Sequence, residues 1–167
     1  MLEKLYPDDT AASTYDIDFE QLYREGIRGI IFDIDNTLVP HDAPADKRAV
    51  GLFRRLKKIG FKCCLVSNNK KQRVDMFNRE VHVFTLENAH KPSRKAYRKA
   101  MHLMGTNTAS TISIGDQIFT DIWGANRAGI RTILVGQIAK KEEFQIVLKR
   151  YLEKIVIHFY KRKTADK

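Results

Sequence analysis

The sequence lacks long hydrophobic runs: no stretch approaches the roughly 18 apolar residues that a membrane-spanning helix needs. It begins MLEKLYPDDT, with acidic residues where a signal peptide would have its apolar core. Together these absences predict a cytoplasmic protein. Peripheral contact with the inner face of a membrane stays open.

Cysteine is also scarce, and the two cysteines, Cys63 and Cys64, are adjacent within an apolar run. They do not have the spacing of metal ligands, so we expect buried free thiols in a reducing compartment. Internal repeats and low-complexity linkers are missing as well. We therefore predict one domain over residues 1–167, with a core of about 13–140 and a basic C-terminal helix at about 140–163.

The composition that is present favours a packed globule with a basic surface. Hydrophobic residues make up 43% of the 167 positions, enough for a folded core. Lys and Arg number 30 against 20 Asp and Glu, which gives a net charge of +10. Such a surface attracts nucleic acid, phosphorylated substrates or anionic lipid headgroups, and charge alone does not choose among them.

Short apolar runs alternate with segments of helical period along the chain, a pattern typical of a parallel sheet covered on both faces. The predicted strands are 27–33, 61–67, 81–86, 110–115 and 131–135. The predicted helices are 18–26, 45–60, 70–79, 91–105, 121–128 and 140–163. We expect an α/β fold: a doubly wound, Rossmann-like three-layer sandwich whose ligands bind beyond the carboxyl ends of the strands.

Polar side chains gather at those strand ends. They are Asp33, Asp35, Asn36 and Thr37 after the first strand, Ser67, Asn68 and Asn69 after the second, Lys91 after the third, and Asp116, Gln117 and Asp121 after the fourth. Several acids, one hydroxyl and one lysine at one edge of a sheet suit phosphoryl chemistry.

Each of these residue types has a role that such chemistry requires. Asp33 and Asp116 can hold Mg²⁺, which prefers one or two carboxylates together with water and phosphate oxygens. Ser67 can donate a hydrogen bond to a phosphate oxygen, and Lys91 can neutralise phosphate charge. Asp33 and Asp35, two positions apart in extended chain, are expected to face the same way.

A calcium-binding loop is the main alternative interpretation of DIDNTL. Such a loop needs Gly at its sixth position and Glu at its twelfth. Leu38 and Pro44 stand there, so this interpretation is excluded.

The segments DIDNTL, VSNN, HKP and GDQIFTD resemble the four motifs of the haloacid dehalogenase (HAD) superfamily of phosphotransferases. More narrowly, STYDIDFEQLYREGIRGIIFDIDNTLV and LKRYLEKIV resemble the subfamily IIIA, YqeG-like branch. That branch includes the eukaryotic mitochondrial phosphatidylglycerophosphate phosphatases. The resemblance covers residues 13–163.

The resemblance implies a Mg²⁺-dependent phosphatase in which Asp33 attacks phosphorus and Asp35 acts as general acid and then base. Mg²⁺ is expected between the Asp33 carboxylate, the Asp35 main-chain carbonyl and Asp116. The remaining implied site residues are Ser67, Asn68 and Lys91 on the phosphate, with Thr37 and Asp121 orienting the groups around it.

A capless fold is predicted, because neither interval between motifs has room for a lid domain. The helix at 45–60 fills the interval between Asp35 and Ser67, and one helix and one strand fill that between Ser67 and Lys91. An open site favours a phosphate on a large or membrane-borne substrate, by resemblance a lipid phosphate such as phosphatidylglycerophosphate.

Other substrates and functions remain as alternatives. The same chemistry could act on a phosphoprotein or a nucleic-acid end, with nucleic acid less favoured. A non-catalytic receiver-type or binding domain is less favoured still, since VHVFTLEN offers no phosphate-accepting Asp after the third strand. The sequence does not indicate an oligomeric state.

The C-terminal helix allows two interpretations. Its apolar stripe consists of Phe144, Leu148, Tyr151, Leu152, Ile155 and Phe159, and its basic residues are Lys149, Arg150, Lys154, Lys161, Arg162 and Lys163. The stripe either packs on the sheet, leaving a solvated basic tail, or lies on anionic lipid.

Overall fold

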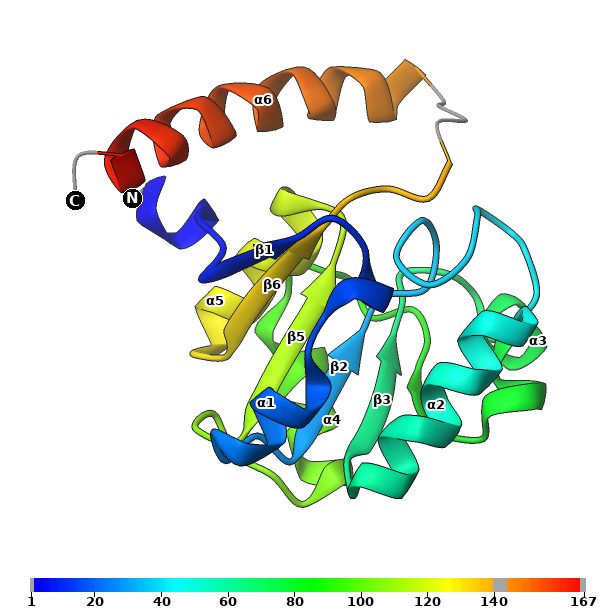
Figure 1. Ribbon diagram of the computed structural model, residues 1–167. Helices are drawn as coiled ribbons and strands as arrows, with labels where there is room; N and C mark the ends of the chain where they lie inside the picture. The colour runs from blue at the N-terminus through cyan, green and yellow to red at the C-terminus, as the bar shows by residue number, and fades with distance from the viewer. Residues whose placement is uncertain (1, 140–143, 166–167) are drawn as a thin grey trace.

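The computed structural model describes residues 2–139 and 144–165 (Figure 1). Its centre is a parallel sheet with the strand order β1-β6-β5-β2-β3-β4. The strands are β1 (Asp9–Ala11), β2 (Gly29–Phe32), β3 (Lys62–Val66), β4 (Phe84–Leu86), β5 (Thr111–Gly115) and β6 (Arg131–Val135). The predicted α/β fold with a parallel central sheet is confirmed.

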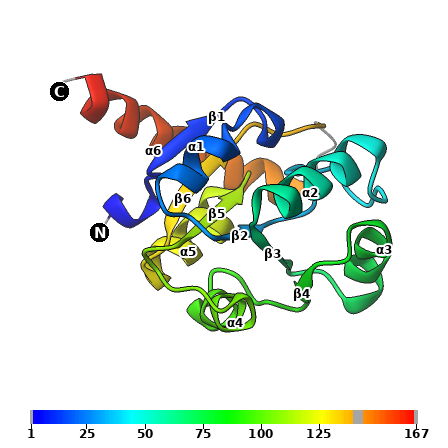
Figure 2. The same cartoon turned by 60° about the horizontal axis from the view of Figure 1, so that its bottom comes forward.

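Helices cover both faces of this sheet (Figure 2). Their bounds are α1 (Phe19–Arg24), α2 (Lys47–Ile59), α3 (Lys71–Val81), α4 (Arg94–Met104), α5 (Trp123–Ala128) and α6 (Phe144–Ala165), with short turns η1 (Leu2–Leu5), η2 (Thr14–Asp16) and the π-helical η3 (Ile118–Ile122). One core cluster joins the sheet to α1, α2 and α3, and the other joins it to α4 and α5.

Successive side chains along a strand point to opposite faces of the sheet, so one strand can contribute to both core clusters. In β2, Ile30 and Phe32 pack in the first cluster and Ile31 packs in the second. In β3, Cys63 and Cys64 likewise enter opposite clusters. Both cysteines are free and buried, as predicted, and burial raises the pKa of each thiol to about 12.

The helix boundaries follow local capping chemistry. Asp46 accepts a hydrogen bond from the Ala49 N–H at 2.7 Å and so begins α2. Gly60 ends it in a left-handed conformation with φ 115°.

The structure corrects the predicted strands in two places. It adds β1, an edge strand that pairs with β6 but is too short and polar to show an apolar period. The predicted strand at 81–86 is only Phe84–Leu86, because α3 continues to Val81 and ends at His82 in a left-handed conformation.

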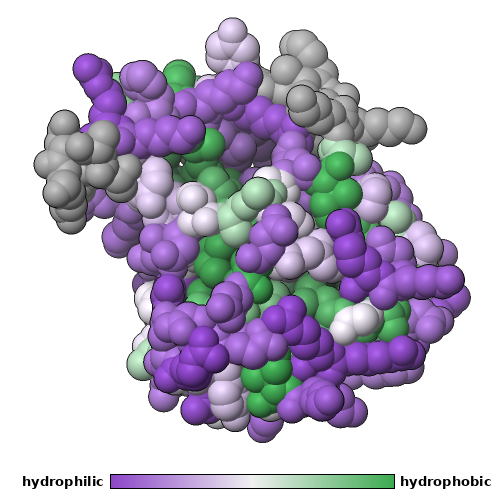
Figure 3. Space-filling model, viewed as in Figure 1, coloured by the Kyte–Doolittle hydropathy of each residue, from purple (hydrophilic) through white to green (hydrophobic). Residues whose placement is uncertain are grey.

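No lid domain interrupts residues 2–139, in agreement with the predicted capless fold: α2 and β3 lie between Asp35 and Ser67, and α3 and β4 lie between Ser67 and Lys91. The surface seen in Figure 3 is mainly hydrophilic, with hydrophobic side chains in separate patches. This suits a chain of net charge +10.

α6 lies across the end of the sheet towards which β2 and β3 point (Figure 1). Its predicted start at 140, and the side chains of Phe144, Leu148 and Lys163, lie outside the described part of the chain. α6 packs inwards through Glu153 and Val156.

The apolar stripe faces the other way. Tyr151, Leu152, Ile155 and Phe159 are all about half exposed or more. The interpretation that the stripe packs on the sheet is therefore wrong for these four residues. Among the described residues, no helix is long and apolar enough to cross a membrane.

Candidate active site

Asp33 directly follows β2, so its carboxylate lies at the carboxyl end of the sheet. Thr37 joins it to the end of β5: the Thr37 Oγ1 is 3.1 Å from Asp33 Oδ2 and 3.2 Å from Asp116 Oδ1. Thr37 is fully buried, so its hydroxyl is held between the two carboxylates. The structure thus brings together the first and fourth predicted motifs.

Lys91 links the third motif to the same group. Its Nζ donates to Asp33 Oδ1 at 2.7 Å and to Asp121 Oδ1 at 2.6 Å. Burial works to lower the pKa of Lys91, but the charges of Asp121 and Asp33 outweigh it and raise that pKa well above its ordinary value. The lysine is therefore a permanent buried cation beside Asp33.

One lysine does not balance three carboxylates. Carboxylate oxygens of Asp33, Asp116 and Asp121 all lie within 4.8 Å of one another. Burial, opposed by Lys91, raises the pKa of Asp33 to about 6. Burial and the charges of Asp33 and Asp121 raise the pKa of Asp116 well above its ordinary value.

This excess of buried negative charge fits a hard divalent cation, which prefers carboxylate oxygens. Gln137, which follows β6, steadies Asp116, since its Nε2 donates to Asp116 Oδ2 at 2.9 Å. The residues present can therefore hold a metal ion at the predicted edge of the sheet.

Asp35 lies in different surroundings from Asp33. Arg73 Nη2 is 2.7 Å from Asp35 Oδ1, and Asn69 Nδ2 is 2.5 Å from Asp35 Oδ2. The Asp42 N–H donates to Oδ1 at 2.9 Å. The carboxylate of Asp35 is thus bound towards α3 and does not join the cluster of Asp33, Asp116 and Asp121, although the sequence predicted that both aspartates face the same way.

Ser67 and Asn68 follow β3, as predicted. Ser67 is 2% exposed, and its Oγ accepts a hydrogen bond from the Asn69 N–H at 3.1 Å. The side chain of Asn68 accepts from the Lys91 N–H at 2.6 Å and donates to the Lys91 carbonyl at 3.3 Å. In the structure Asn68 therefore positions the backbone of Lys91.

Close packing around β5 fixes Asp121. A Cβ on Gly115 would stand 2.4 Å from the Asp121 Cβ, so only glycine fits there. Tyr97 supports η3 from α4, with its hydroxyl 3.2 Å from the carbonyl oxygens of both Thr120 and Asp121. The turn that carries Asp121 is held from two sides.

Sequence reasoning missed Arg73, Asn69 and Gln137. Asn69 stood in a cluster that was singled out, but it was given no role. Arg73 lies within a helix and Gln137 after the last strand, where no motif marks them. Asp35 was a carboxylate for which the sequence suggested no cationic side-chain partner, and this could have prompted a search for one.

Comparisons with known proteins agree with this geometry. Residues 88–146 match the HAD-hydrolase-like family model. The chain is 36% identical over 165 residues to "Probable phosphatase YqeG" from Bacillus subtilis (strain 168), covering 98% of this chain and 96% of that protein. The chain belongs to the HAD phosphatases of the YqeG branch.

This HAD phosphatase has further relatives. It is 29% identical to "Phosphatidylglycerophosphate phosphatase 1, chloroplastic/mitochondrial" from Arabidopsis thaliana, over 83% of this chain and 45% of that protein. A cobalt-bound deoxy-D-mannose-octulosonate 8-phosphate phosphatase from Haemophilus influenzae shares its fold, with a TM-score of 0.50 and 14% identity over 80% of this chain and 89% of that one. The predicted family and hydrolase class are confirmed.

Proposed function

We propose that this HAD phosphatase hydrolyses phosphomonoesters with Mg²⁺ through an aspartyl-phosphate on Asp33, and that its substrate is a lipid phosphate such as phosphatidylglycerophosphate. The observation that carries the chemistry is the buried cluster of Asp33, Lys91, Asp116 and Asp121 at one edge of the sheet. A nucleophilic carboxylate beside a fixed cation and further metal-binding acids suits attack on a phosphate dianion.

Asp33 attacks phosphorus while the bond from phosphorus to the substrate oxygen breaks. Asp35 gives a proton to that leaving oxygen, then takes one from the water that attacks the aspartyl-phosphate. The bond between phosphorus and Asp33 breaks in that second step, which releases inorganic phosphate and restores the carboxylate. Lys91 neutralises charge on the phosphate oxygens, Ser67 donates a hydrogen bond to one of them, and Asn68 holds the backbone of Lys91 in place.

Asp33, Asp116 and the main-chain carbonyl of Asp35 would hold Mg²⁺, and the carboxylate of Asp121 lies beside those of Asp33 and Asp116. When bound, the ion offsets the negative charge that accumulates as the phosphoryl group is transferred. Thr37 orients Asp33 and Asp116, and Asp121 orients Lys91.

Two observations support a lipid phosphate. No lid domain lies among residues 2–139, so the site can admit a phosphate on something too large to enclose. One relative over most of the chain is a phosphatidylglycerophosphate phosphatase by name. A phosphoprotein or nucleic-acid end would also fit an open site and remains the alternative substrate.

Phosphate release from phosphatidylglycerophosphate in mixed micelles tests both parts of the proposal. The assay runs with Mg²⁺ and with chelator, beside an aryl phosphate, and with Asp33→Asn as the inactive control. Mg²⁺-dependent release from the lipid that is lost in the variant is expected. Release from the aryl phosphate alone would keep the mechanism and reject the lipid substrate.

Loss of Asp35 provides a separate test of its role. Asp35→Asn should bind Mg²⁺ as the unsubstituted protein does and lose turnover by about 10²–10⁴-fold, the usual contribution of a general acid. Full turnover in this variant would show that another group acts as the general acid and base.

A further inference from the structure

The outer face of α6 is apolar although the core lies on its other side. Tyr151 is 69% exposed, Leu152 and Ile155 are each 51% exposed, and Phe159 is 49% exposed. The residues between them, Glu153 and Val156, are buried. A helix that needed only to cover the sheet would place polar side chains outwards, so this second apolar face calls for a partner.

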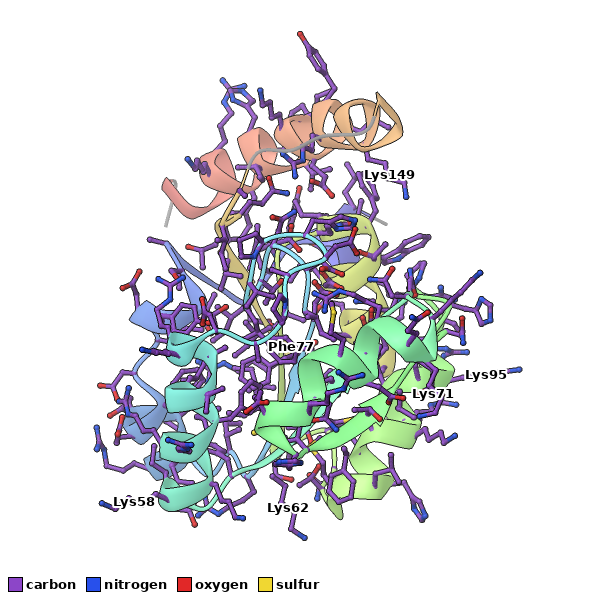
Figure 4. All side chains as sticks on the ribbon, turned by 90° about the vertical axis from the view of Figure 1, so that its right-hand side faces the viewer. Lys58, Lys62, Lys71, Phe77, Lys95 and Lys149 are labelled. Atoms are coloured by element: carbon purple, nitrogen blue, oxygen red, sulfur yellow. The ribbon has the colours of Figure 1, made fainter. Side chains whose placement is uncertain are left out.

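Exposed cations border this face. Lys154 lies beside it, with its Nζ 5.9 Å from the centre of the Tyr151 ring, and Arg162 is exposed beyond Phe159. Lys149, by contrast, projects from the same helix on the side that faces the rest of the domain (Figure 4). An apolar stripe with basic residues at its sides is the pattern of a helix that lies in the interface of an anionic membrane.

A groove joins α6 to the catalytic cluster. It has a volume of about 560 Å³ and is lined on one side by residues after β6, including Gly136 and Gln137, and on the other by Lys154 and Ile157 of α6. Asp116 lies in the same groove. A phosphate carried at the surface that α6 touches therefore has a path to the acids of the site.

We propose that the outer face of α6, formed by Tyr151, Leu152, Ile155 and Phe159, docks the enzyme on an anionic lipid bilayer. This proposal rests on the proposed function, because it makes the groove between α6 and Asp116 the route of a lipid headgroup. The apolar side chains enter the boundary between headgroups and acyl chains, and Lys154 and Arg162 contact anionic headgroups.

A second copy of this chain fits the face less well. Pairing two α6 helices would bring Lys154 and Arg162 of each close to those of the other, in a protein that already carries a net charge of +10. An anionic lipid surface instead attracts these basic side chains.

Vesicle co-flotation with a triple variant tests the apolar contribution. Leu152→Ser, Ile155→Ser and Phe159→Ser combined should weaken binding to phosphatidylcholine vesicles containing phosphatidylglycerol by about tenfold or more. None of the three lines the groove, and all are exposed, so folding and hydrolysis of a soluble aryl phosphate should be unchanged. Phe84→Ser is the matched control, because Phe84 on β4 is 41% exposed.

A charge reversal tests the choice of lipid. Lys154→Glu with Arg162→Glu should abolish the preference for phosphatidylglycerol over phosphatidylcholine alone. Lys58→Glu is the control, since Lys58 lies at the end of the molecule remote from α6 (Figure 4). It should leave the preference unchanged.

Several outcomes would overturn the proposal. They are an unsubstituted protein that does not bind anionic vesicles, a triple variant that binds as well as the original, and an equal loss in Phe84→Ser. A triple variant that changes only the oligomeric state, seen by light scattering, would assign the face to a second copy. Vesicle binding without hydrolysis of the lipid phosphate would reject the proposed substrate and leave the docking face standing.

Discussion

Arg73 holds the carboxylate of Asp35 through a short ion pair: Nη2 lies 2.7 Å and Nε 3.3 Å from the same oxygen, Oδ1. The two side chains are only 9% and 12% exposed. Asn69 and the Asp42 N–H bind the same carboxylate. The group proposed to move protons is therefore fixed by neighbours from α3, from the loop after β3 and from the loop after β2.

Removing Arg73 should impair proton delivery more than phosphate binding. For Arg73→Ala we expect kcat on an alkyl phosphate to fall by about 10–100-fold, part of the general-acid contribution, with KM nearly unchanged. An aryl phosphate should lose less, because its leaving oxygen needs no proton. Arg73→Lys should recover part of the loss.

Lys71→Ala is the control for that experiment, since Lys71 lies in the same first turn of α3 and forms an ion pair, but with Asp75 on the surface. Steady-state kinetics on both substrates gives the comparison. An equal loss on alkyl and aryl phosphates would show that Arg73 does not act through Asp35.

The metal-free protein should lose stability as the pH rises through about 6. Burial raises the pKa of Asp33 to about 6 and that of Asp116 well above its ordinary value, so both favour the protonated form when folded. Their contribution is complete below the unfolded value of about 4 and is lost as the folded carboxyls ionise. We expect Tm in chelator to be lower at pH 8 than at pH 5, and excess Mg²⁺ at pH 8 to raise it.

Asp116→Asn isolates the site from other titrating groups. In chelator its Tm should depend less on pH, and Mg²⁺ should raise it less than in the unsubstituted protein. Identical pH profiles for the two proteins would mean that the cluster carries no excess charge.

Gly115→Ala should damage both stability and activity. The new Cβ would stand 2.4 Å from the Asp121 Cβ, so Asp121 must move away from Lys91. We expect a loss of about 1–3 kcal/mol in the free energy of unfolding, as for other overpacked sites, together with slower turnover.

Gly51→Ala is the matched control for Gly115, because a Cβ at Gly51 in α2 meets nothing within 4 Å. It should raise the free energy of unfolding by about 0.5–1 kcal/mol. Denaturant unfolding measures both variants, and an unperturbed Gly115→Ala would refute the described packing.

Glu153→Gln should stabilise the protein at neutral pH. Burial raises the pKa of Glu153, whose Oε1 accepts a hydrogen bond from the Ile118 N–H at 3.1 Å. A glutamine oxygen can accept that bond without a buried charge. We expect a gain of up to about 1 kcal/mol at pH 8 that shrinks as the pH falls to about 4, where the glutamate is largely protonated in both the folded and the unfolded state.

Glu153→Ala, by contrast, should lower Tm at every pH, because it leaves the Ile118 N–H without its partner. Thermal unfolding of the three proteins across this pH range gives the comparison. A destabilised Glu153→Gln at pH 8 would show that the charge itself is needed to hold α6.

Clusters of apolar residues were enough to predict most of the sheet, because β2, β3, β5 and β6 are mostly buried and rich in Ile, Leu, Val and Cys. β1 could not be predicted, since its Asp-Thr-Ala carries no such period and exists only by pairing with β6. Which side of α6 packs against the rest of the protein could not be predicted either. Val156 on its inner face and Ile155 on its outer face are equally apolar in sequence.

The site was predictable where residues directly follow strands, because the sheet itself brings Asp33, Ser67 and Asp116 to one edge. Arg73 could not be found in this way. It reaches Asp35 only because β3 lies beside β2 and places α3 next to the loop after β2. Such long-range partners depend on tertiary packing that no local pattern encodes.

The order of the cluster along the chain has a consequence for synthesis. Lys91 comes 58 residues after Asp33, and Asp121 comes 30 residues after Lys91. A growing chain on the ribosome therefore presents Asp33, the proposed nucleophile, long before Lys91 and Asp121. The proposed chemistry can begin only when β5 and η3 have emerged and joined the sheet, so we expect a nascent chain that lacks them to be inert towards cellular phosphates.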